Sequence, residues 1–256
     1  MILDGEGLDN EEMLRIAKWT NLSETTFLVP PTAAEADYRA RIFTQTGEIP
    51  FAGHPTLGSA RAWLDHGGAS RSAGAIVQEC GAGLVELREE AGALSFAAPP
   101  TTRTGPIEDR HLADIVSVLG IAAEQVVDHQ WVDNGPGWAA VRLASAEEVL
   151  ALEPDFSRLP DAMVGVVGAH PAHSAHDFEL RAFAPGANVA EDPVTGSLNA
   201  SVAQWLIRTG QAPRRYTATQ GTRLGRSGEI AVHADDAGDV WIGGATAVLL
   251  RGAAFA

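Results

Sequence analysis

Three ionisable side chains stand where proton-transfer chemistry could take place: Glu24, His54 and Asp192. Glu24 is the one ionisable residue in a polar turn, residues 21–26, that leads into an apolar strand. Enclosure away from water would raise the pKa of this carboxyl group toward neutrality. Glu24 could then take a proton from carbon and return it elsewhere. Without enclosure it is an ordinary capping or solvated residue, and both interpretations remain open from spacing alone.

His54 and Asp192 each precede a proline in a repeated motif, HPTLGS at residues 54–59 and DPVTGS at residues 192–197. An Arg-x-Phe stretch precedes each copy, at residues 41–43 and 181–183, and a helical pattern follows. Such internal similarity predicts two similar domains. A histidine side chain titrates near neutral pH and suits acid–base catalysis, although a histidine beside proline is often structural. Asp192 could equally cap a helix.

The Gly-Ser pair that ends each motif would begin a helix. Backbone N–H groups and the helix dipole at such a terminus favour an anion, typically a carboxylate or phosphate. Two turns of this kind facing one another could hold a small acidic molecule between them. Ser59 and Ser197 could also simply cap helices, and the repeat favours the functional interpretation for Ser197 more than for Ser59.

The elements expected to position these residues alternate irregularly. Helices are predicted at 10–20, 56–64, 111–119, 146–152 and 197–208, and strands at 26–29, 38–44, 75–79, 84–88, 93–96, 137–143, 163–168, 178–183, near 230 and at 240–242. The lack of regular strand–helix–strand spacing argues against a doubly wound parallel sheet. A linker rich in Pro and Thr at 99–106 predicts an N-terminal domain over 1–104 and a C-terminal domain over 105–256.

Composition narrows the classes of partner. The 256 residues include 33 acidic and 18 basic side chains, for a net charge of −15. Nucleic acid and acidic membranes would be repelled by this charge, so neither is expected as a partner. The longest apolar stretches, such as residues 245–250, are far shorter than the ~20 residues that span a bilayer. The first ten residues carry three acids and no basic residue, unlike a signal peptide.

Metal and disulfide chemistry are not expected. Cys80 is the single cysteine, which fits a cytoplasmic location. His170, His173 and His176 have spacings that a metal could use, but their polar loop offers only Asp177 as an acidic neighbour. No P-loop or nucleophile-elbow motif is present. These residues therefore favour neither a metal site, nor a phosphate-binding loop, nor a serine hydrolase.

Several segments together resemble the phenazine-biosynthesis isomerase-like family, in the family's order and over nearly the whole chain. They are NLSETTF at 21–27, FTQTGEIPFAGHPTLG at 43–58, QECGAG at 78–83, EDPVTGS at 191–197 and QGTRLGR at 220–226. The resemblance implies the α+β diaminopimelate-epimerase-like fold: two similar domains, each a curved, mostly antiparallel sheet around a central helix, with the site in the cleft. Members of this family usually open with a strand and a Gly-Asn-Pro hairpin before the segment matched here by residues 2–4. Two expectations follow from the resemblance: either the start site is misassigned, or the first domain lacks that hairpin.

The resemblance also implies roles for individual residues. Glu24 would match the family's catalytic acid/base glutamate, and His54 and Asp192 the partners that hold or move the proton. Gly53, Gly196 and Ser197 would match the groups that bind the substrate carboxylate and ring. The characterised member isomerises a dihydro-hydroxyanthranilate without metal or organic cofactor, and homodimers are common among similar proteins. The expected function is thus cofactor-independent isomerisation of a small cyclic or conjugated carboxylate by glutamate acid–base catalysis.

Two alternatives remain. An amino-acid racemase of the same fold would need two opposed cysteines, whereas this chain has only Cys80, with Glu24 and Asp192 at the expected cysteine positions. A catalytically silent protein that binds a small carboxylate in the same cleft is the other alternative.

Overall fold

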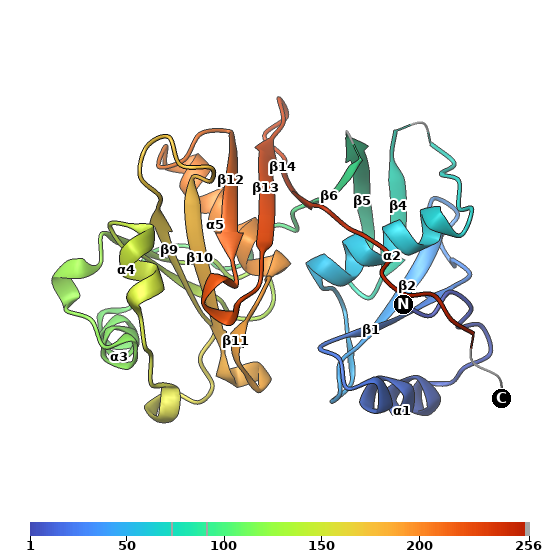
Figure 1. Cartoon of the computed structure of the whole chain (residues 1–256), viewed down its shortest axis with the longest axis horizontal. Coiled ribbons are helices and arrows are strands. Elements are labelled where there is room, and N and C mark those ends of the chain that lie inside the picture. The colour runs from blue at the N-terminus through green and yellow to red at the C-terminus, as the bar shows by residue number, and fades with distance from the viewer. Residues whose placement is uncertain (73, 91, 254–256) are drawn as a thin grey trace. The chain divides into compact units, whose positions relative to one another are not determined.

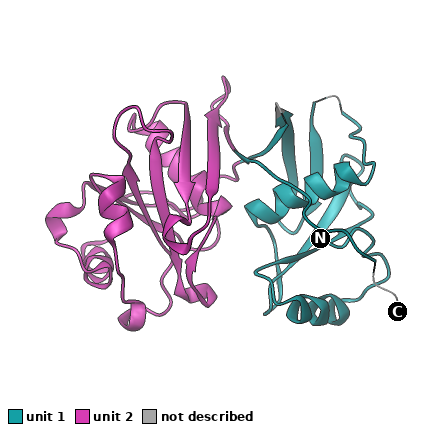
Figure 2. Cartoon of the chain, viewed as in Figure 1, with its two compact units in different colours: residues 1–97, 243–256 teal, residues 98–242 magenta. Residues whose placement is uncertain are grey.

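The computed structural model describes residues 1–72, 74–90 and 92–253 and divides the chain into two compact units (Figures 1 and 2). Unit 1 comprises Met1–Ala97 and the C-terminal segment that begins at Gly243, and unit 2 comprises Ala98–Ile242. The sequence predicted a boundary at residue 104 and assigned the whole C-terminal part to the second domain. The segment from Gly243 belongs instead to unit 1, where Arg61 Nε donates to Thr246 Oγ1 at 3.3 Å.

Unit 1 contains a mixed sheet and two helices. Its elements are α1 (Asn10–Thr20), β1 (Thr25–Val29), β2 (Tyr38–Phe43), β3 (Glu48–Ile49), α2 (Gly53–Asp65), β4 (Ile76–Cys80), β5 (Gly83–Glu90) and β6 (Ala93–Ala97). The strand order is β1-β2-β4-β5-β6, with β3 on β2, and only β2 and β4 pair in parallel. Helix α2 contacts β1, β2, β4 and β6 and is the central helix of the unit (Figure 1). Helix α1 packs on β1 and β2 through Met13, Ala17, Phe27 and Phe43.

The described N-terminal segment pairs with the outer edge of β1. Ile2 bridges Phe27 in parallel; its N–H donates to the Thr26 carbonyl and its carbonyl accepts from the Leu28 N–H, both at 2.8 Å. The Gly5 N–H donates to the Leu28 carbonyl at 2.9 Å. These bonds satisfy backbone groups that an edge strand would otherwise expose.

Unit 2 has a second mixed sheet around a buried helix. Its elements are α3 (Asp109–Leu119), η1 (Ala123–Gln125), β7 (Asp128–Trp131), β8 (Ala139–Arg142), α4 (Ala146–Ala151), η2 (Phe156–Arg158), β9 (Val164–Ala169), β10 (Phe178–Ala184), η3 (Pro185–Ala187), β11 (Val189–Asp192), α5 (Gly196–Arg208), β12 (Arg215–Gln220), η4 (Thr222–Leu224), β13 (Gly228–Ala234) and β14 (Val240–Gly244). The strand order is β14-β13-β12-β10-β9-β8-β7, with β11 on β10. Helix α5 is the central helix and is largely buried.

The two units repeat one topology. Strand β2 pairs antiparallel with β1 and β3 and parallel with β4, and β10 pairs antiparallel with β9 and β11 and parallel with β12. The phenylalanine of each Arg-x-Phe stretch has the same register, because Phe43 lies opposite the first residue of β1 and Phe183 opposite the first residue of β9. A 13-residue helix follows β3 in unit 1 and β11 in unit 2. The predicted pair of similar domains is confirmed.

The predicted register of the repeat is wrong, however. His54 is the second residue of α2, whereas Asp192 ends β11, before α5 begins. Helix α2 can begin before Pro55 because N–H groups in the first turn have no intrahelical acceptor. The N–H that proline lacks therefore costs the helix no hydrogen bond. Ser59 is therefore a buried residue inside α2 rather than a helix start. The helix starts match at Gly53 and Gly196.

No helix in the described ranges is long and apolar enough to cross a membrane.

Candidate active site

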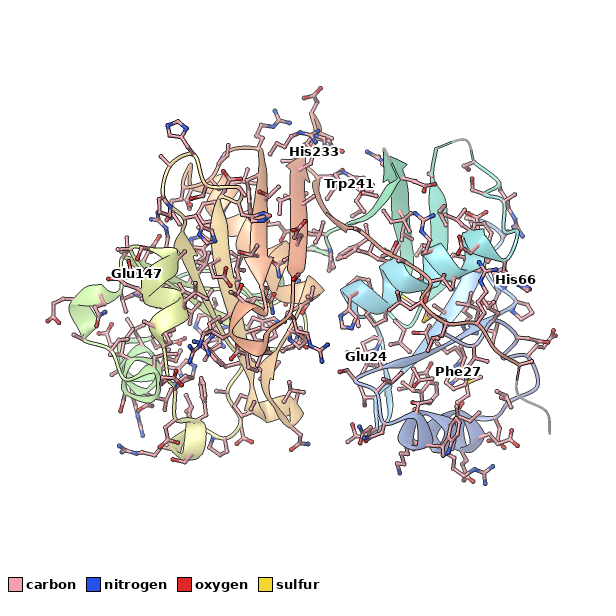
Figure 3. All side chains as sticks on the ribbon, viewed as in Figure 1. Glu24, Phe27, His66, Glu147, His233 and Trp241 are labelled. Carbon is pink, nitrogen blue, oxygen red and sulfur yellow. The ribbon has the colours of Figure 1, made fainter. Side chains whose placement is uncertain are left out.

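Glu24 and His54 form a close acid–base pair in unit 1. Glu24 directly precedes β1 (Figure 3), His54 lies in the first turn of α2, and Glu24 Oε2 is 3.0 Å from His54 Nε2. The Glu24 side chain is 19% exposed and that of His54 45%. A largely covered carboxylate beside an accessible imidazole can exchange a proton with a bound molecule.

An arginine–glutamate clamp fixes the segment that leads into α2. Arg41 of β2 donates from Nε to Glu48 Oε1 at 2.9 Å and from Nη2 to Oε2 at 2.5 Å, which raises the pKa of Arg41. Beyond this clamp, Pro50 packs so closely on Gly81 that a side-chain Cβ at Gly81 would lie 2.8 Å from Pro50 Cα. The bidentate clamp and the close packing hold the start of α2 in place.

The same clamp recurs in unit 2. Arg181 of β10 donates from Nε to Glu191 Oε1 at 2.9 Å and from Nη2 to Oε2 at 2.7 Å. Its Nη1 also donates to the carbonyls of Val149 and Leu152, so the guanidinium group anchors the end of α4 as well. Glu191 belongs to β11, which ends at Asp192 and leads to α5.

Asp192 is hydrogen-bonded to a buried polar network. Its Oδ2 accepts from Thr195 Oγ1 at 2.5 Å, and its backbone carbonyl accepts from Gln220 Nε2 at 2.8 Å. Gln220 Oε1 accepts from the Thr195 N–H at 3.1 Å and from Asn199 Nδ2 at 2.7 Å. Thr195, Asn199 and Gln220 are buried, and they fix the Asp192 carboxylate in one orientation as a hydrogen-bond acceptor.

Ser197 is held at both its hydroxyl and its carbonyl. Trp138 Nε1 donates to Ser197 Oγ at 3.0 Å, and Asn134 Nδ2 donates to the Ser197 carbonyl at 2.9 Å. Neither partner is indicated by the sequence, where Trp138 falls within the predicted strand at 137–143. The turn-rich sequence DNGPG at 133–137 was the available signal for a loop at this place.

The structure therefore brings the predicted site residues together in two groups. Glu24, Gly53 and His54 lie together in unit 1, and Asp192, Gly196 and Ser197 lie together in unit 2. The N-cap residues, Ala52 of α2 and Thr195 of α5, make no side-chain hydrogen bond to the N–H groups of their helix starts. The convergence of the two groups on a single site stays a prediction.

Other chemically active groups are placed differently. Burial raises the pKa of the Cys80 thiol, and its Sγ donates to the Gly83 carbonyl at 3.5 Å, so Cys80 is poorly suited to act as a thiolate base. Within the described part of the chain, no three His, Cys, Asp or Glu side chains group as metal ligands, and this includes His170, His173 and His176.

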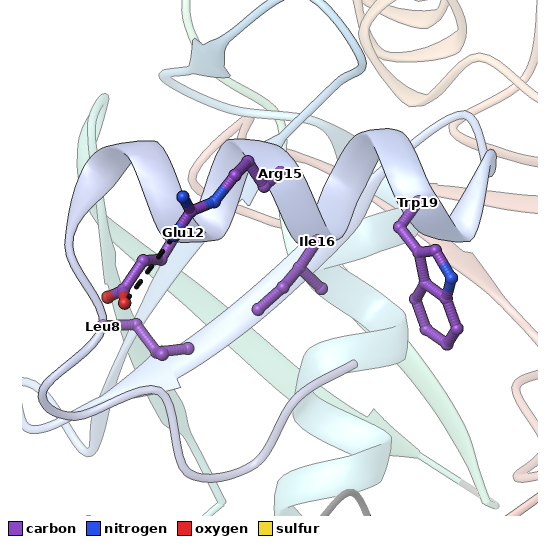
Figure 4. A pocket seen from close by; sticks show the side chains of 5 residues that line it. All are labelled: Leu8, Glu12, Arg15, Ile16 and Trp19. Carbon is purple, nitrogen blue, oxygen red and sulfur yellow. Dashed lines mark ion pairs between the residues drawn. The ribbon is translucent and has the colours of Figure 1, made fainter. Parts of the chain in front are cut away.

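A surface depression of about 320 Å³ lies on α1, apart from every predicted site residue (Figure 4). Its lining residues are Leu8, Glu12, Arg15, Ile16 and Trp19. Glu12 caps the N-terminus of α1 together with Asp9, so its carboxylate already has a structural partner. Nothing in this depression matches proton-transfer chemistry.

Comparison with known proteins places these features in one family. The model of the phenazine biosynthesis-like (PhzC-PhzF) family matches residues 1–255. A Schizosaccharomyces pombe protein named antisense-enhancing sequence 1 is 35% identical, with 100% of this chain and 92% of that protein covered. The trans-2,3-dihydro-3-hydroxyanthranilate isomerase of Pseudomonas aeruginosa is 32% identical, with 93% and 85% covered.

The fold agrees with this assignment. The crystal structure of an Enterococcus faecalis protein of the PhzF family superposes with a TM-score of 0.79 at 25% identity, covering 99% of this chain and 91% of that one. The expected diaminopimelate-epimerase-like α+β fold is confirmed. With a family match over nearly all of its length, the chain belongs to the phenazine biosynthesis-like family.

Proposed function

We propose that this protein is a cofactor-independent isomerase that moves a proton between two carbons of a small cyclic or conjugated carboxylate. The observation that carries the proposal is the 3.0 Å contact between the covered Glu24 carboxylate and the more exposed His54 imidazole. Isomerases of dihydro-hydroxyanthranilate among the relatives support this class of reaction and substrate.

In this proposal Glu24 is the acid/base. Its carboxylate removes a proton from a carbon next to the conjugated system, the C–H electron pair enters that system, and Glu24 returns the proton to another carbon. The product is an isomer, so no oxidant or reductant is consumed. His54 orients the Glu24 carboxylate through Nε2, and Asp192 holds or shares the proton.

The substrate carboxylate would bind at the helix starts. The N–H groups at Gly196 and Ser197 and the dipole of α5 attract an anion, and Gly53 offers the same at α2. These local donors counter a net charge of −15 that would otherwise repel an acidic substrate.

The decisive experiment compares Glu24→Gln and Asp192→Asn with the wild type, using a dihydro-hydroxyanthranilate or a related diene acid in H₂O and D₂O. Glu24→Gln keeps size and hydrogen bonding but cannot accept the proton, so kcat should fall about 10²–10⁴-fold. Substrate affinity should change little. Asp192→Asn should be milder if Asp192 only orients the substrate, and comparable if it shares the proton.

The matched control is Glu11→Gln, at an exposed carboxylate of α1, which should leave turnover unchanged. Full activity of Glu24→Gln would show that the base is another residue. Carboxylate binding without turnover, equal in wild type and Glu24→Gln, would favour a silent binding protein of the same fold.

We further propose a cytoplasmic homodimer. The single cysteine, which is buried and free, is compatible with a reducing compartment. Light scattering on the purified full chain tests the dimer, since a mass near 26.8 kDa would identify a monomer.

A further inference from the structure

A loop of unit 2 sets the chemical character of Ser197. The loop connects β7 to β8, and from it Trp138 Nε1 donates to Ser197 Oγ while Asn134 Nδ2 donates to the Ser197 carbonyl. Ser201 Oγ, one turn further along α5, also donates to that carbonyl at 3.0 Å. Ser197 is thus held by three side-chain donors.

The loop is built to keep Trp138 in place. Trp138 is only 2% exposed, which fixes its indole within the core. Asp133 Oδ1 accepts from the N–H groups of Gly135 and Gly137 at 2.8 and 2.6 Å, which closes the turn before Trp138. The positive φ angles of Gly135 and Gly137, 136° and 91°, are ones that glycine adopts readily.

An indole N–H can donate a hydrogen bond but cannot accept one. It therefore occupies one of the two lone pairs of Ser197 Oγ and biases the hydroxyl toward donating its proton to a ligand. The backbone N–H groups of the first turn of α5 are donors as well. A ligand group at this helix start consequently meets mainly donors, which favours a group that is itself an acceptor.

We propose that Trp138 is a positioning residue that makes Ser197 a hydrogen-bond donor and thereby selects a carboxylate over a carboxamide. The inference rests on the proposed function, in which Ser197 faces the substrate. A carboxylate offers two acceptor oxygens, whereas a carboxamide places an NH₂ group against donors. Without the indole N–H, the Ser197 hydroxyl can rotate and accept from that NH₂ group.

The test replaces Trp138 by benzothienylalanine, which keeps the shape of the ring but carries sulfur in place of the N–H. Anthranilate and anthranilamide are titrated separately, with the amide resonances of Gly196, Ser197 and Leu198 as the readout. The wild type should prefer anthranilate, and the replacement should reduce the ratio of the two dissociation constants about fivefold to tenfold, the scale of one hydrogen bond. Trp138→Phe should act in the same direction.

Two controls separate positioning from a general structural effect. The same analogue at Trp241, whose Nε1 donates to Asp235 Oδ2 at 2.9 Å, should leave the ratio unchanged. In a Ser197→Ala background, the replacement at Trp138 should no longer alter the ratio, because the hydroxyl through which it acts is gone. A full effect in that background would overturn the inference.

An unchanged ratio with anthranilate bound at Gly196 and Ser197 would also overturn it, as would the absence of any anthranilate-induced shift at these residues in the wild type. None of these readouts requires turnover. A protein that shows the predicted selectivity but no Glu24-dependent isomerisation would contradict the proposed function and leave the inference intact.

Discussion

The segments that lead into α2 and α5 share four residues, which we call the frame of each helix start. They differ in the residue that follows the frame. The shared residues are Arg41 and Arg181, Glu48 and Glu191, Pro50 and Pro193, and Gly53 and Gly196. The next residue is His54 in α2 and Ser197 in α5. Imidazole gains and loses a proton near neutral pH, whereas a serine hydroxyl only exchanges hydrogen bonds. In the proposed function, this one position separates a residue that assists proton transfer from one that binds the ligand.

The frames also differ in burial. The Arg181 and Glu191 side chains are 4% and 11% exposed, against 16% and 37% for Arg41 and Glu48. Arg181 additionally holds two carbonyls at the end of α4. The frame of unit 2 is therefore expected to depend much more strongly on its clamp.

The largest effect is expected from breaking that clamp. Arg181→Met leaves the Glu191 carboxylate buried without its partner and should lower the free energy of unfolding by about 3–5 kcal/mol. Arg41→Met, at the more exposed clamp, should cost about 1 kcal/mol or less. Urea unfolding measures both, and Arg181→Met combined with Glu191→Leu should recover part of the loss. Equal costs for the two single variants would show that burial does not distinguish the clamps.

A smaller effect separates the two presented residues. His54→Ser gives α2 the residue that α5 carries, and it should lower kcat about 100-fold with little change in KM. Ser197→Ala should instead raise KM about tenfold with little change in kcat. Steady-state kinetics on both variants test the division, and a kcat defect in Ser197→Ala equal to that of His54→Ser would contradict it.

The smallest effect concerns a carboxylate that the units place on different strands. In unit 1, Glu79 on β4 lies opposite Arg39, whereas in unit 2 the acid Glu179 lies on β10 opposite Thr219. Burial acts to raise the pKa of Glu79, but hydrogen bonds from Thr32 and Ala33 outweigh it and hold the pKa below its usual value.

A carboxyl group with a depressed folded-state pKa stabilises the protein above its unfolded pKa and loses that contribution as pH falls. Glu79→Gln should therefore lower the free energy of unfolding by about 1–2 kcal/mol at pH 7. The difference from wild type should shrink as the pH drops below about 4. Glu35→Gln, at an exposed carboxylate, should change stability by less than about 0.5 kcal/mol at pH 7. If the loss in free energy of unfolding for Glu79→Gln did not vary with pH, ionisation of Glu79 would not be its cause.

The sequence predicted those elements whose ends are set by residues close to them in the chain. Helix α1 has the predicted bounds, because its N-terminus is set by the capping box of Asp9 and Glu12. Strand β12 was not predicted from the sequence, although buried and less buried residues alternate along it as in an ordinary strand. Strand β11 has no such pattern, and it is positioned by the clamp to Arg181 of β10.

The repeat and the site show the same limit. The motif comparison detected the duplication but paired His54 with Asp192, because neither Ala52 nor Thr195 marks its helix start by a side-chain cap. Glu24 and His54 belong to different sequence motifs, and neither motif predicts their contact. Only the resemblance to a family implied that the two residues act together. The bond from Trp138 to Ser197 joins loop and helix across the chain, so no local pattern indicates it.

The return of the chain to unit 1 after Ile242 has a consequence for synthesis on the ribosome. Helix α2, which carries His54, is held by the late segment through Arg61 with Thr246 and Asp65 with Arg251. Unit 2 is continuous from Ala98 to Ile242, so all of its residues emerge before this segment does. Unit 1, most of which is translated first, therefore receives its remaining residues last. Helix α2 gains these contacts only when translation has passed Arg251.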